Sequence, residues 1–388
     1  MIPYGKQHVD RQDKKEVLKA LGDTFLTTGP RVKKLEDLIK KKTNSKFALV
    51  SNSGTSALHL SFMAIGIKPK DNIIMPAINF IASYNICKTL KANIYLADVD
   101  PVQGVMTPKT FQECVKKFKI KKIKAIVVMY LGGQPRYNEE FYRIKKKKKC
   151  FLIEDACHAF GARYKFKNKI YSVGSCKHSD ISTFSFHPVK TFTTGEGGAV
   201  TTNNQQFAKK VNELRSHCII RNTDEYWKYD VNDYGYNFRL SDINCALGIS
   251  QIKKINSFIQ KRSKIANYYI KKFDKLKKFI NYSKPDKFQY SNTWHLFIIS
   301  INFKKLNTTK DAFLNFLRKK KIFCQFHYIP IYRFSIAKRF YKKLKYSEIY
   351  FKNAISIPLF YSLKEKDQRM IVKLISQFLV KNIKQTSN

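Results

Sequence analysis

Apolar residues recur along the chain with two spacings, one helical and one typical of buried strands. Residues 10–21 and 32–42 have the helical spacing, and the first of these segments ends at Gly22. Short apolar runs at 47–50, 72–76, 92–97 and 125–129 are typical of buried strands, and the last two each follow Lys-rich helical sequence. Repeated strand–helix units of this kind predict an α/β fold.

The pattern changes after residue 242. Residues 243–270 predict one long helix, and we place a domain boundary within it, near Ser250. Beyond it, residues 294–301 and 322–326 predict strands, and residues 309–318 and 363–380 predict helices. We therefore expect a large domain over residues 1–250 and a smaller α+β domain over residues 251–388.

The 388-residue chain is strongly basic, with 74 Lys and Arg against 28 Asp and Glu and a formal net charge of +46. Such a charge can indicate a polyanionic partner. Here the excess is mostly Lys and is spread along the whole chain, together with abundant Ile, Asn, Tyr and Phe, as an A/T-rich genome would encode. We therefore expect no nucleic-acid partner, although the charge would concentrate an anionic substrate near the protein.

The cysteines and the apolar runs bear on location. Eight cysteines are scattered without a C-x-x-C pair or a His/Cys cluster at metal-binding spacing, which favours reduced thiols and no bound metal. No run approaches the length of a membrane span, and the N-terminus lacks the apolar region of a signal peptide. We expect a cytoplasmic protein without a membrane partner.

One lysine stands apart from the others. Lys190 follows the strand-like run Ser182–Phe186 and Pro188, and it precedes a glycine-rich bend into another strand. Most lysines of this chain lie in Lys-rich runs and read as solvated surface charges, whereas the nearest charged neighbour of Lys190 is Glu196. An amine in such company can lose its proton near neutral pH and attack a carbonyl carbon.

Two further segments suggest ligand contacts. The run from Ser51 to Ser56 turns from a strand into a helix through small and hydroxyl residues, which is typical of a phosphate site but equally of an ordinary N-cap. Residues 151–155 predict a strand that ends at Asp155, at the sheet edge where ligands bind. An acid there can also cap a helix, but together with Lys190 a functional role is favoured.

The segment Phe-Ser-Phe-His-Pro-Val-Lys, followed by Thr-Thr-Gly-Glu-Gly-Gly-Ala-Val, resembles the pyridoxal-phosphate (PLP) sugar aminotransferases of the DegT/DnrJ/EryC1/StrS family. The resemblance runs from Ile2 to the end of the chain, and Gly132–Pro135 shares in it. Within the family, the chain looks most like the UDP-sugar C4 aminotransferases of pseudaminic acid biosynthesis. This resemblance implies a type I aminotransferase fold, with a mixed, mostly parallel sheet in the large domain.

The resemblance also implies an activity and the residues that perform it. The enzyme would move an amino group from L-glutamate to the keto carbon of a UDP-linked 4-keto-6-deoxy amino sugar, with Lys190 as the catalytic residue that holds PLP. The implied cofactor-binding residues are Thr55, Ser56, Phe80, Asp155, His158, Ser185 and Asn237. The implied substrate-binding residues are Tyr4, Thr24, Phe25, Leu26, Thr27, Gly54, His187, Gln325, Phe326, His327 and Tyr328. Asn237 would reach the neighbouring subunit's cofactor, so the resemblance implies a homodimer with shared sites.

Three other functions compete with this interpretation. Dehydratases of the same family carry histidine in place of the lysine, so Lys190 argues against them. Transamination of another nucleotide 4-keto sugar, of the perosamine or bacillosamine type, stays open. A non-catalytic basic regulatory protein on the same scaffold would predict loss of Lys190 or Asp155, and both residues are present.

Overall fold

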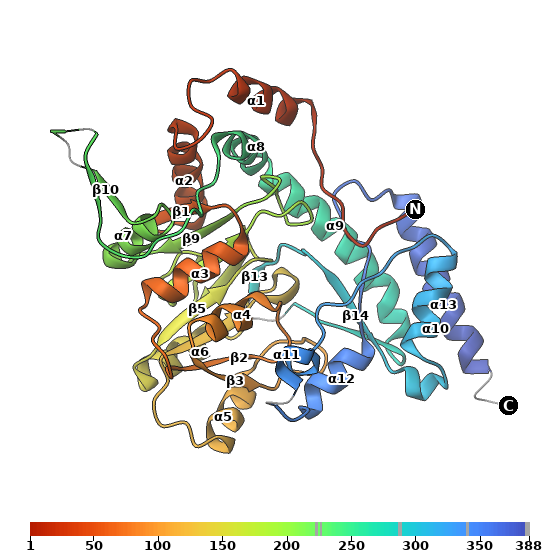
Figure 1. Ribbon diagram of the computed structural model, residues 1–388. Coiled ribbons are helices and arrows are strands. Elements are labelled where there is room, and N and C mark those ends of the chain that lie inside the picture. Colours follow the sequence, from red (N-terminus) through yellow and green to blue (C-terminus); the bar gives the residue numbers. More distant parts are fainter. Residues whose placement is uncertain (222–223, 226, 286–288, 339–340, 385–388) are drawn as a thin grey trace.

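The computed structural model describes residues 1–221, 224–225, 227–285, 289–338 and 341–384 (Figure 1). A central seven-stranded sheet occupies the first half of the chain, in the order β1-β9-β8-β5-β4-β2-β3. Its strands are β1 (Phe47–Ser51), β9 (Gly198–Thr202), β8 (Ile181–Ser185), β5 (Phe151–Asp155), β4 (Ala125–Met129), β2 (Asn72–Pro76) and β3 (Asn93–Ala97). In this sheet β9 runs antiparallel to β1 and β8, whereas the pairs from β8 to β3 are parallel. The α/β prediction is confirmed.

Helices cover both faces of this sheet because the strand side chains alternate between two apolar clusters. Val50 points into one cluster and its neighbour Leu49 into the other. The helices of the first cluster include α2 (Pro30–Thr43), α5 (Pro108–Lys117), α6 (Asn138–Lys148) and α8 (Asp242–Lys253). Those of the second include α3 (Gly54–Ala64), α4 (Ala82–Thr89) and α7 (Gln205–Leu214). The sheet is thus the middle layer of three.

A third apolar cluster lies in the C-terminal part, around the antiparallel sheet β12-β14-β15. The strands are β12 (Ile280–Tyr282), β14 (Phe297–Ile301) and β15 (Ala354–Ile357). The helices of this part are α9 (Ile255–Phe273), α10 (Lys310–Lys319), α11 (Ser335–Lys338), α12 (Lys345–Asn353) and α13 (Glu365–Lys384). Ile2 belongs to the same cluster, so the first residues of the chain pack with the last third.

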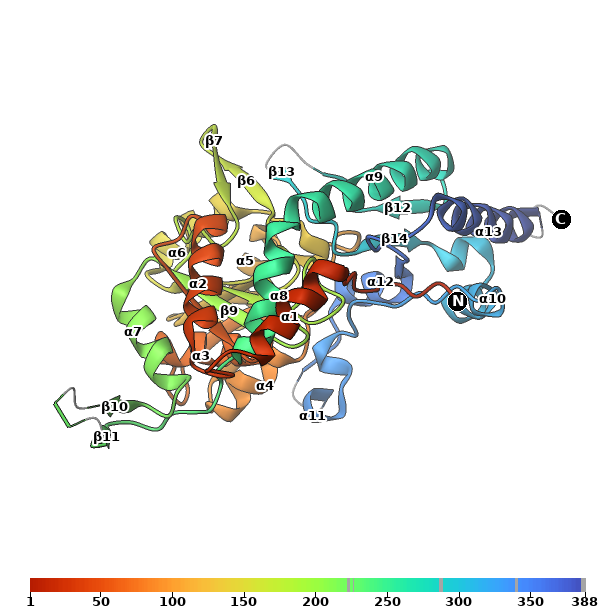
Figure 2. The ribbon, with the colours of Figure 1, turned by 90° about the horizontal axis from the view of Figure 1, so that it is seen from above.

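Two smaller sheets project from the body. Strand β6 (Arg163–Phe166) pairs with β7 (Lys169–Ser172) and with β13 (Gln289–Ser291), which links the two parts of the chain. The hairpin of β10 (Ile219–Arg221) and β11 (Tyr229–Val231) extends away from the central sheet in both ribbon views (Figures 1 and 2).

Two expectations about local structure were wrong. The predicted helix over 243–270 is two helices, α8 and α9, separated at Lys254. The predicted strand at 322–326 forms only isolated bridges, at Ile322 and Gln325.

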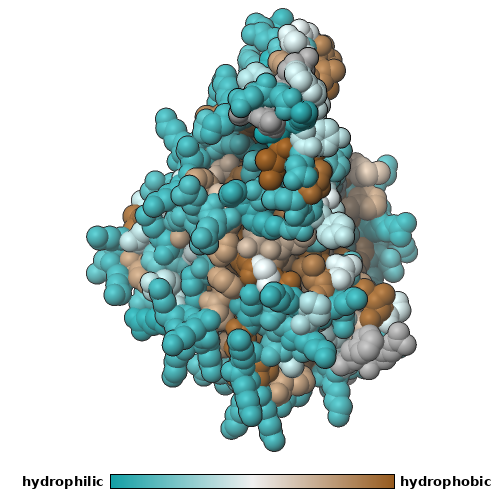
Figure 3. Space-filling view, turned by 60° about the vertical axis from the view of Figure 1, so that its left-hand side comes forward, coloured by the Kyte–Doolittle hydropathy of each residue, from teal (hydrophilic) through white to brown (hydrophobic). Residues whose placement is uncertain are grey.

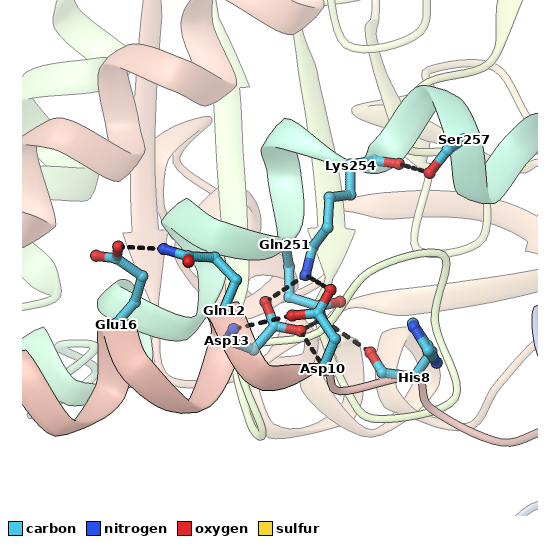
Figure 4. A network of polar contacts seen from close by, with 8 residues as sticks. All are labelled: His8, Asp10, Gln12, Asp13, Glu16, Gln251, Lys254 and Ser257. Atoms are coloured by element: carbon cyan, nitrogen blue, oxygen red, sulfur yellow. Dashed lines mark hydrogen bonds and ion pairs between the residues drawn. The ribbon is translucent and has the colours of Figure 1, made fainter.

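Side chains at the junction of α8 and α9 hold the N-terminal segment in place (Figure 4). The Lys254 ammonium donates to Asp10 Oδ2 and to Asp13 Oδ1, each at 2.7 Å. Asp13 is fully buried and also accepts from Gln251 Nε2 at 2.6 Å. The same Gln251 amide donates to the His8 carbonyl, so residues 8–13 are tied to this junction.

The surface is largely hydrophilic, as expected from the many charged residues in the sequence. The face in Figure 3 is mostly hydrophilic, with small, separate apolar areas. Among the described residues, no helix combines the length and the apolar character that crossing a membrane requires.

Replacing Lys254 with methionine should destabilise the fold. The Asp13 carboxylate would stay buried without its cation, which costs about 3 kcal/mol by analogy with other broken buried pairs. Chemical denaturation at neutral pH measures this change, and Lys253→Met is the matched control because Lys253 is the exposed neighbouring residue. Equal effects of the two variants would contradict the anchoring role of Lys254.

The effect of Lys254→Met on the free energy of unfolding should depend on pH. The hydrogen bond from Lys254, together with weaker contributions from the backbone N–H groups of Asp13 and Gln12, lowers the pKa of Asp10 from 3.8 to about 2. A depressed carboxyl pKa stabilises the fold fully above pH 4, and this contribution is lost as the pH falls from about 4 to about 2. The stability difference between the wild type and Lys254→Met should therefore narrow over that interval.

Candidate active site

A cavity of about 420 Å³ lies at the carboxyl edge of the central sheet. Residues from the N-terminus, the large sheet and the C-terminal part form its walls. The lining residues are Tyr4, Ser53, Gly54, Thr55, Leu58, Phe80, Ala82, Met129, Asp155, Cys157, His158, Ser185, His187, Val189, Lys190, Glu196, His295, His327 and Tyr328. The cavity thus brings together most of the residues that the sequence singled out.

Lys190 lies on the loop that follows β8. Its backbone N–H donates to the His187 carbonyl at 2.8 Å, which closes a turn and fixes where the side chain leaves the loop. Burial lowers the pKa of the Lys190 amine, although Cys157 and the Asp155 carboxylate act in the opposite direction. The amine is therefore easier to deprotonate than a surface lysine.

Asp155 is the last residue of β5 and is only 3% exposed. One carboxylate oxygen, Oδ1, accepts from the Cys157 N–H at 3.3 Å. Burial raises the pKa of this carboxyl, while the hydrogen bonds from Cys157 and the charge of Lys190 lower it. A buried carboxylate is stabilised by a cation placed against it, so a protonated ring nitrogen would suit this position.

The start of α3 forms the opposite end of the cavity. Ser53 is the N-cap and its hydroxyl accepts from the Ser56 N–H at 3.0 Å. Within the described part of the chain, the N–H groups of Gly54 and Thr55 donate to no protein acceptor. Free N–H groups at a helix start favour an anion, so this end of the cavity suits a phosphate.

The glycine at this helix start is required by its surroundings. A Cβ added to Gly54 would lie 2.7 Å from Ser185 Cβ, and one added to Gly198 would lie 2.3 Å from the Ser53 carbonyl oxygen. The turn before α3 is thus pressed against the ends of β8 and β9. This contact places the free N–H groups and the Ser185 hydroxyl on the same side of the cavity.

Aromatic side chains form the remaining wall. The Phe80 ring is 51% exposed although it lines the cavity, and its centroid lies 5.8 Å from that of Tyr328. Tyr4 and His327 face one another with centroids 5.3 Å apart. An exposed ring next to a buried carboxylate is suited to contact a flat heterocycle.

Some predicted residues lie outside the cavity lining. Ser56 is buried behind the helix start, where its hydroxyl donates to Asn52 Oδ1. Gln325 pairs through its backbone with Ser356, and the Phe326 ring packs against Phe351. Asn237 and the residues Thr24, Phe25, Leu26 and Thr27 are exposed on the surface of the single chain.

The cavity also contains residues that the sequence did not suggest. His295 was expected within a strand, but β14 begins only at Phe297, which leaves His295 in the preceding loop. Cys157 lies between the two predicted residues Asp155 and His158, and this position was its only signal. The other unpredicted lining residues are Ser53, Leu58, Ala82, Met129, Val189 and Glu196.

Comparison with known proteins decides the family. Residues 7–376 match the DegT/DnrJ/EryC1/StrS aminotransferase family. The chain belongs to this family. Aminotransferases of this family depend on PLP, as the resemblance predicted.

Proteins of known name or structure match this aminotransferase over almost its whole length. A Campylobacter jejuni protein named UDP-4-amino-4,6-dideoxy-N-acetyl-beta-L-altrosamine transaminase is 36% identical over 387 residues, 98% of each chain. The structure of Helicobacter pylori PseC, an aminotransferase involved in pseudaminic acid biosynthesis, has a TM-score of 0.86 at 28% identity and 99% coverage of both chains. An aminotransferase from Psychrobacter cryohalolentis has a TM-score of 0.89 at 21% identity, with 98% of this chain and 99% of that one covered, and supports the fold alone.

The residues of the cavity fit PLP. Asp155 supplies a buried carboxylate for a protonated ring nitrogen, Lys190 supplies an amine, and the start of α3 with Ser185 supplies donors for a phosphate. Gly54 allows the start of α3 to pack directly against Ser185, because a Cβ there would lie 2.7 Å from Ser185 Cβ.

Replacing Gly54 with alanine should weaken PLP binding by at least about tenfold, because the new methyl group meets Ser185 and displaces the helix start. Absorbance titration of the protein with PLP measures the dissociation constant. Gly22→Ala is the control, since a Cβ there meets nothing closer than the Lys19 carbonyl at 3.6 Å. Unchanged affinity in Gly54→Ala would show that the phosphate binds elsewhere.

Proposed function

We propose that this aminotransferase moves an amino group from L-glutamate to the C4 keto carbon of a UDP-linked 2-acetamido-2,6-dideoxy-hexos-4-ulose, in pseudaminic acid biosynthesis. The observation that carries the proposal is the placement of Lys190, Asp155 and the anion-binding start of α3 around one cavity. The names of the Campylobacter jejuni and Helicobacter pylori proteins support the choice of sugar and pathway. The overall exchange converts glutamate and a keto sugar into 2-oxoglutarate and an amino sugar.

Each proposed role follows from the environment of a side chain. Bound PLP supplies the carbonyl carbon that takes up the amine and the ring that takes up electrons. The Lys190 amine, with its lowered pKa, would accept a proton from the donor's Cα and pass it to the former aldehyde carbon of PLP. In the second half of the reaction it would move a proton in the opposite direction, from that carbon to C4 of the sugar. The buried Asp155 carboxylate favours a proton on a basic nitrogen placed against it. The Gly54 and Thr55 N–H groups and the Ser185 hydroxyl hold the phosphate.

The alternative to the proposed acceptor is another nucleotide 4-keto sugar, of the perosamine or bacillosamine type. The perosamine and bacillosamine precursors differ from the proposed acceptor in stereochemistry or substituents, which the cavity wall at His187, His327 and Tyr328 would have to distinguish. A non-catalytic regulatory role has less support, because Lys190 and Asp155 lie in one cavity.

We also propose a homodimer whose subunits share their active sites. Asn237 and Thr24–Thr27 lie on the surface of one chain, together with exposed apolar side chains such as Phe25 (56% exposed), Leu26 (46%) and Tyr234 (90%). The two segments are neighbours, since the Asp242 N–H donates to the Leu26 carbonyl at 2.9 Å. A second copy of the chain that covers this surface would bury the apolar side chains. It would also place Asn237 of the first copy at the cavity of the second.

A cytoplasmic location completes the proposal. All eight cysteines lie in the described ranges and none forms a disulfide, as expected in a reducing compartment. Burial also raises the pKa of several of these thiols, Cys150 to about 11 and Cys114 to about 12, which keeps them unreactive.

The first test is an absorbance spectrum of the purified protein with added PLP. A visible band should form in the wild type, disappear in Lys190→Ala, and persist in Lys177→Ala, whose lysine is exposed just before β8. L-Glutamate should abolish the wild-type band, and the proposed keto sugar should restore it. A wild type that forms no Lys190-dependent band would overturn the enzymatic proposal, and restoration by a different keto sugar would correct only the acceptor.

Mixing two inactive variants tests the shared site. Lys190→Ala and Asn237→Ala homodimers should each have low activity, whereas subunit exchange creates heterodimers with one intact site. At equal amounts, about a quarter of the wild-type activity should return. No recovery after demonstrated exchange would contradict a contribution of Asn237 from the neighbouring subunit.

A further inference from the structure

His158 is held in one orientation by the backbone. It lies in the turn after β5, and its Nδ1 accepts from the Gly132 N–H at 3.3 Å. A backbone N–H can only donate, so Nδ1 carries no hydrogen. His158 is therefore neutral, with its hydrogen on Nε2.

The tautomer of His158 decides the role of Tyr328. His158 Nε2 lies 3.1 Å from the Tyr328 hydroxyl oxygen, and because this nitrogen carries the hydrogen, it is the donor. The Tyr328 oxygen thus accepts from His158, and its own hydrogen must point elsewhere. Burial raises the pKa of Tyr328 well above its usual value, so the hydroxyl keeps that hydrogen.

The surroundings keep His158 neutral. The His295 ring lies 4.2 Å away between centroids and the His327 ring 6.4 Å away, and Lys190 is also near. Burial, followed by the charges of Lys190 and His327, lowers the pKa of His158 well below its usual value. Among the described residues, His295 Nδ1 has no hydrogen-bond partner, and burial likewise lowers the pKa of His295. A charged imidazole would be isolated here among other basic groups.

Tyr328 lines the cavity together with Lys190, and its ring faces that of Phe80. We propose that His158 is a positioning residue that fixes the Tyr328 hydroxyl as a hydrogen-bond donor to an oxygen atom beside the Lys190 amine. The inference rests on the proposed function and deepens it. That oxygen belongs either to the PLP ring or to the keto group of the amino acceptor, and no proton is transferred in this role.

Two substitutions separate the two hydrogen bonds of His158. Asparagine places an oxygen where Nδ1 stands, so His158→Asn keeps the bond from Gly132 but cannot reach Tyr328. Glutamine places an amide N–H near the position of Nε2, so His158→Gln keeps the bond to Tyr328. Tyr328→Phe removes the hydroxyl and keeps the ring.

The experiment follows the visible band of the PLP-loaded protein as a function of pH, together with the rates of the separate half-reactions. If the acceptor is the PLP ring oxygen, Tyr328→Phe and His158→Asn should raise the pH midpoint of the band by about one unit, because a hydrogen bond favours the more negative form of that oxygen. If the acceptor is the keto group of the sugar, the midpoint should stay and the sugar half-reaction should slow about tenfold relative to the glutamate half-reaction. In either case His158→Gln should resemble the wild type.

A double-mutant comparison excludes a merely structural role. In the Tyr328→Phe background, His158→Asn should have no further effect on the changed quantity. Equal behaviour of the Asn and Gln variants, an undiminished effect of His158→Asn in that background, or no effect of Tyr328→Phe would overturn the proposal. If His158→Asn fails to fold, the absence of any effect in Tyr328→Phe would still overturn the proposal. Failure of the proposed function would appear instead in the wild type, as a missing Lys190-dependent band or a missing response to glutamate.

Discussion

The active site depends on the parallel pairing of β5 with β8. The register pairs Ile153 with Ile181 and Asp155 with Thr183, so both strands end at the same edge of the sheet. One strand delivers a carboxylate at its last residue, and the loop after the other carries the amine of Lys190. Because the sheet is buried between two helix layers, these positions cannot shift independently. Two groups distant in sequence are thereby held together before any ligand binds.

Local patterns drew attention to this part of the site but left its role open. An acid at the end of a strand, a lysine after a strand and a glycine at a helix start each have a local signature, and the structure places Asp155, Lys190 and Gly54 around one cavity. The family resemblance supplied the chemistry that connects them. Most strands of the central sheet were predictable for the same reason, since each of these is a short apolar run.

Features that depend on distant partners could not be predicted. The helix break at Lys254 follows from its contacts with Asp10 and Asp13, more than 240 residues earlier. Residues 322–326 have strand-like composition, but their partners are the single residues Ile2 and Ser356, so no ladder forms. His295 enters the cavity because its strand begins two residues later, which an apolar pattern does not reveal.

The N-terminal segment contacts both the large and the C-terminal parts of the chain, in addition to the pairing of β6 with β13. Ile2 pairs with Ile322 in the C-terminal part, Tyr4 lines the cavity, and Asp13 lies at the junction of α8 and α9. The segment is held in place near both of its ends, and the residues between these contacts form part of the cavity wall. Deleting the first residues would therefore remove part of the cavity wall together with contacts that stabilise the fold. An N-terminal truncation thus cannot separate an effect on ligand binding from an effect on folding in this protein.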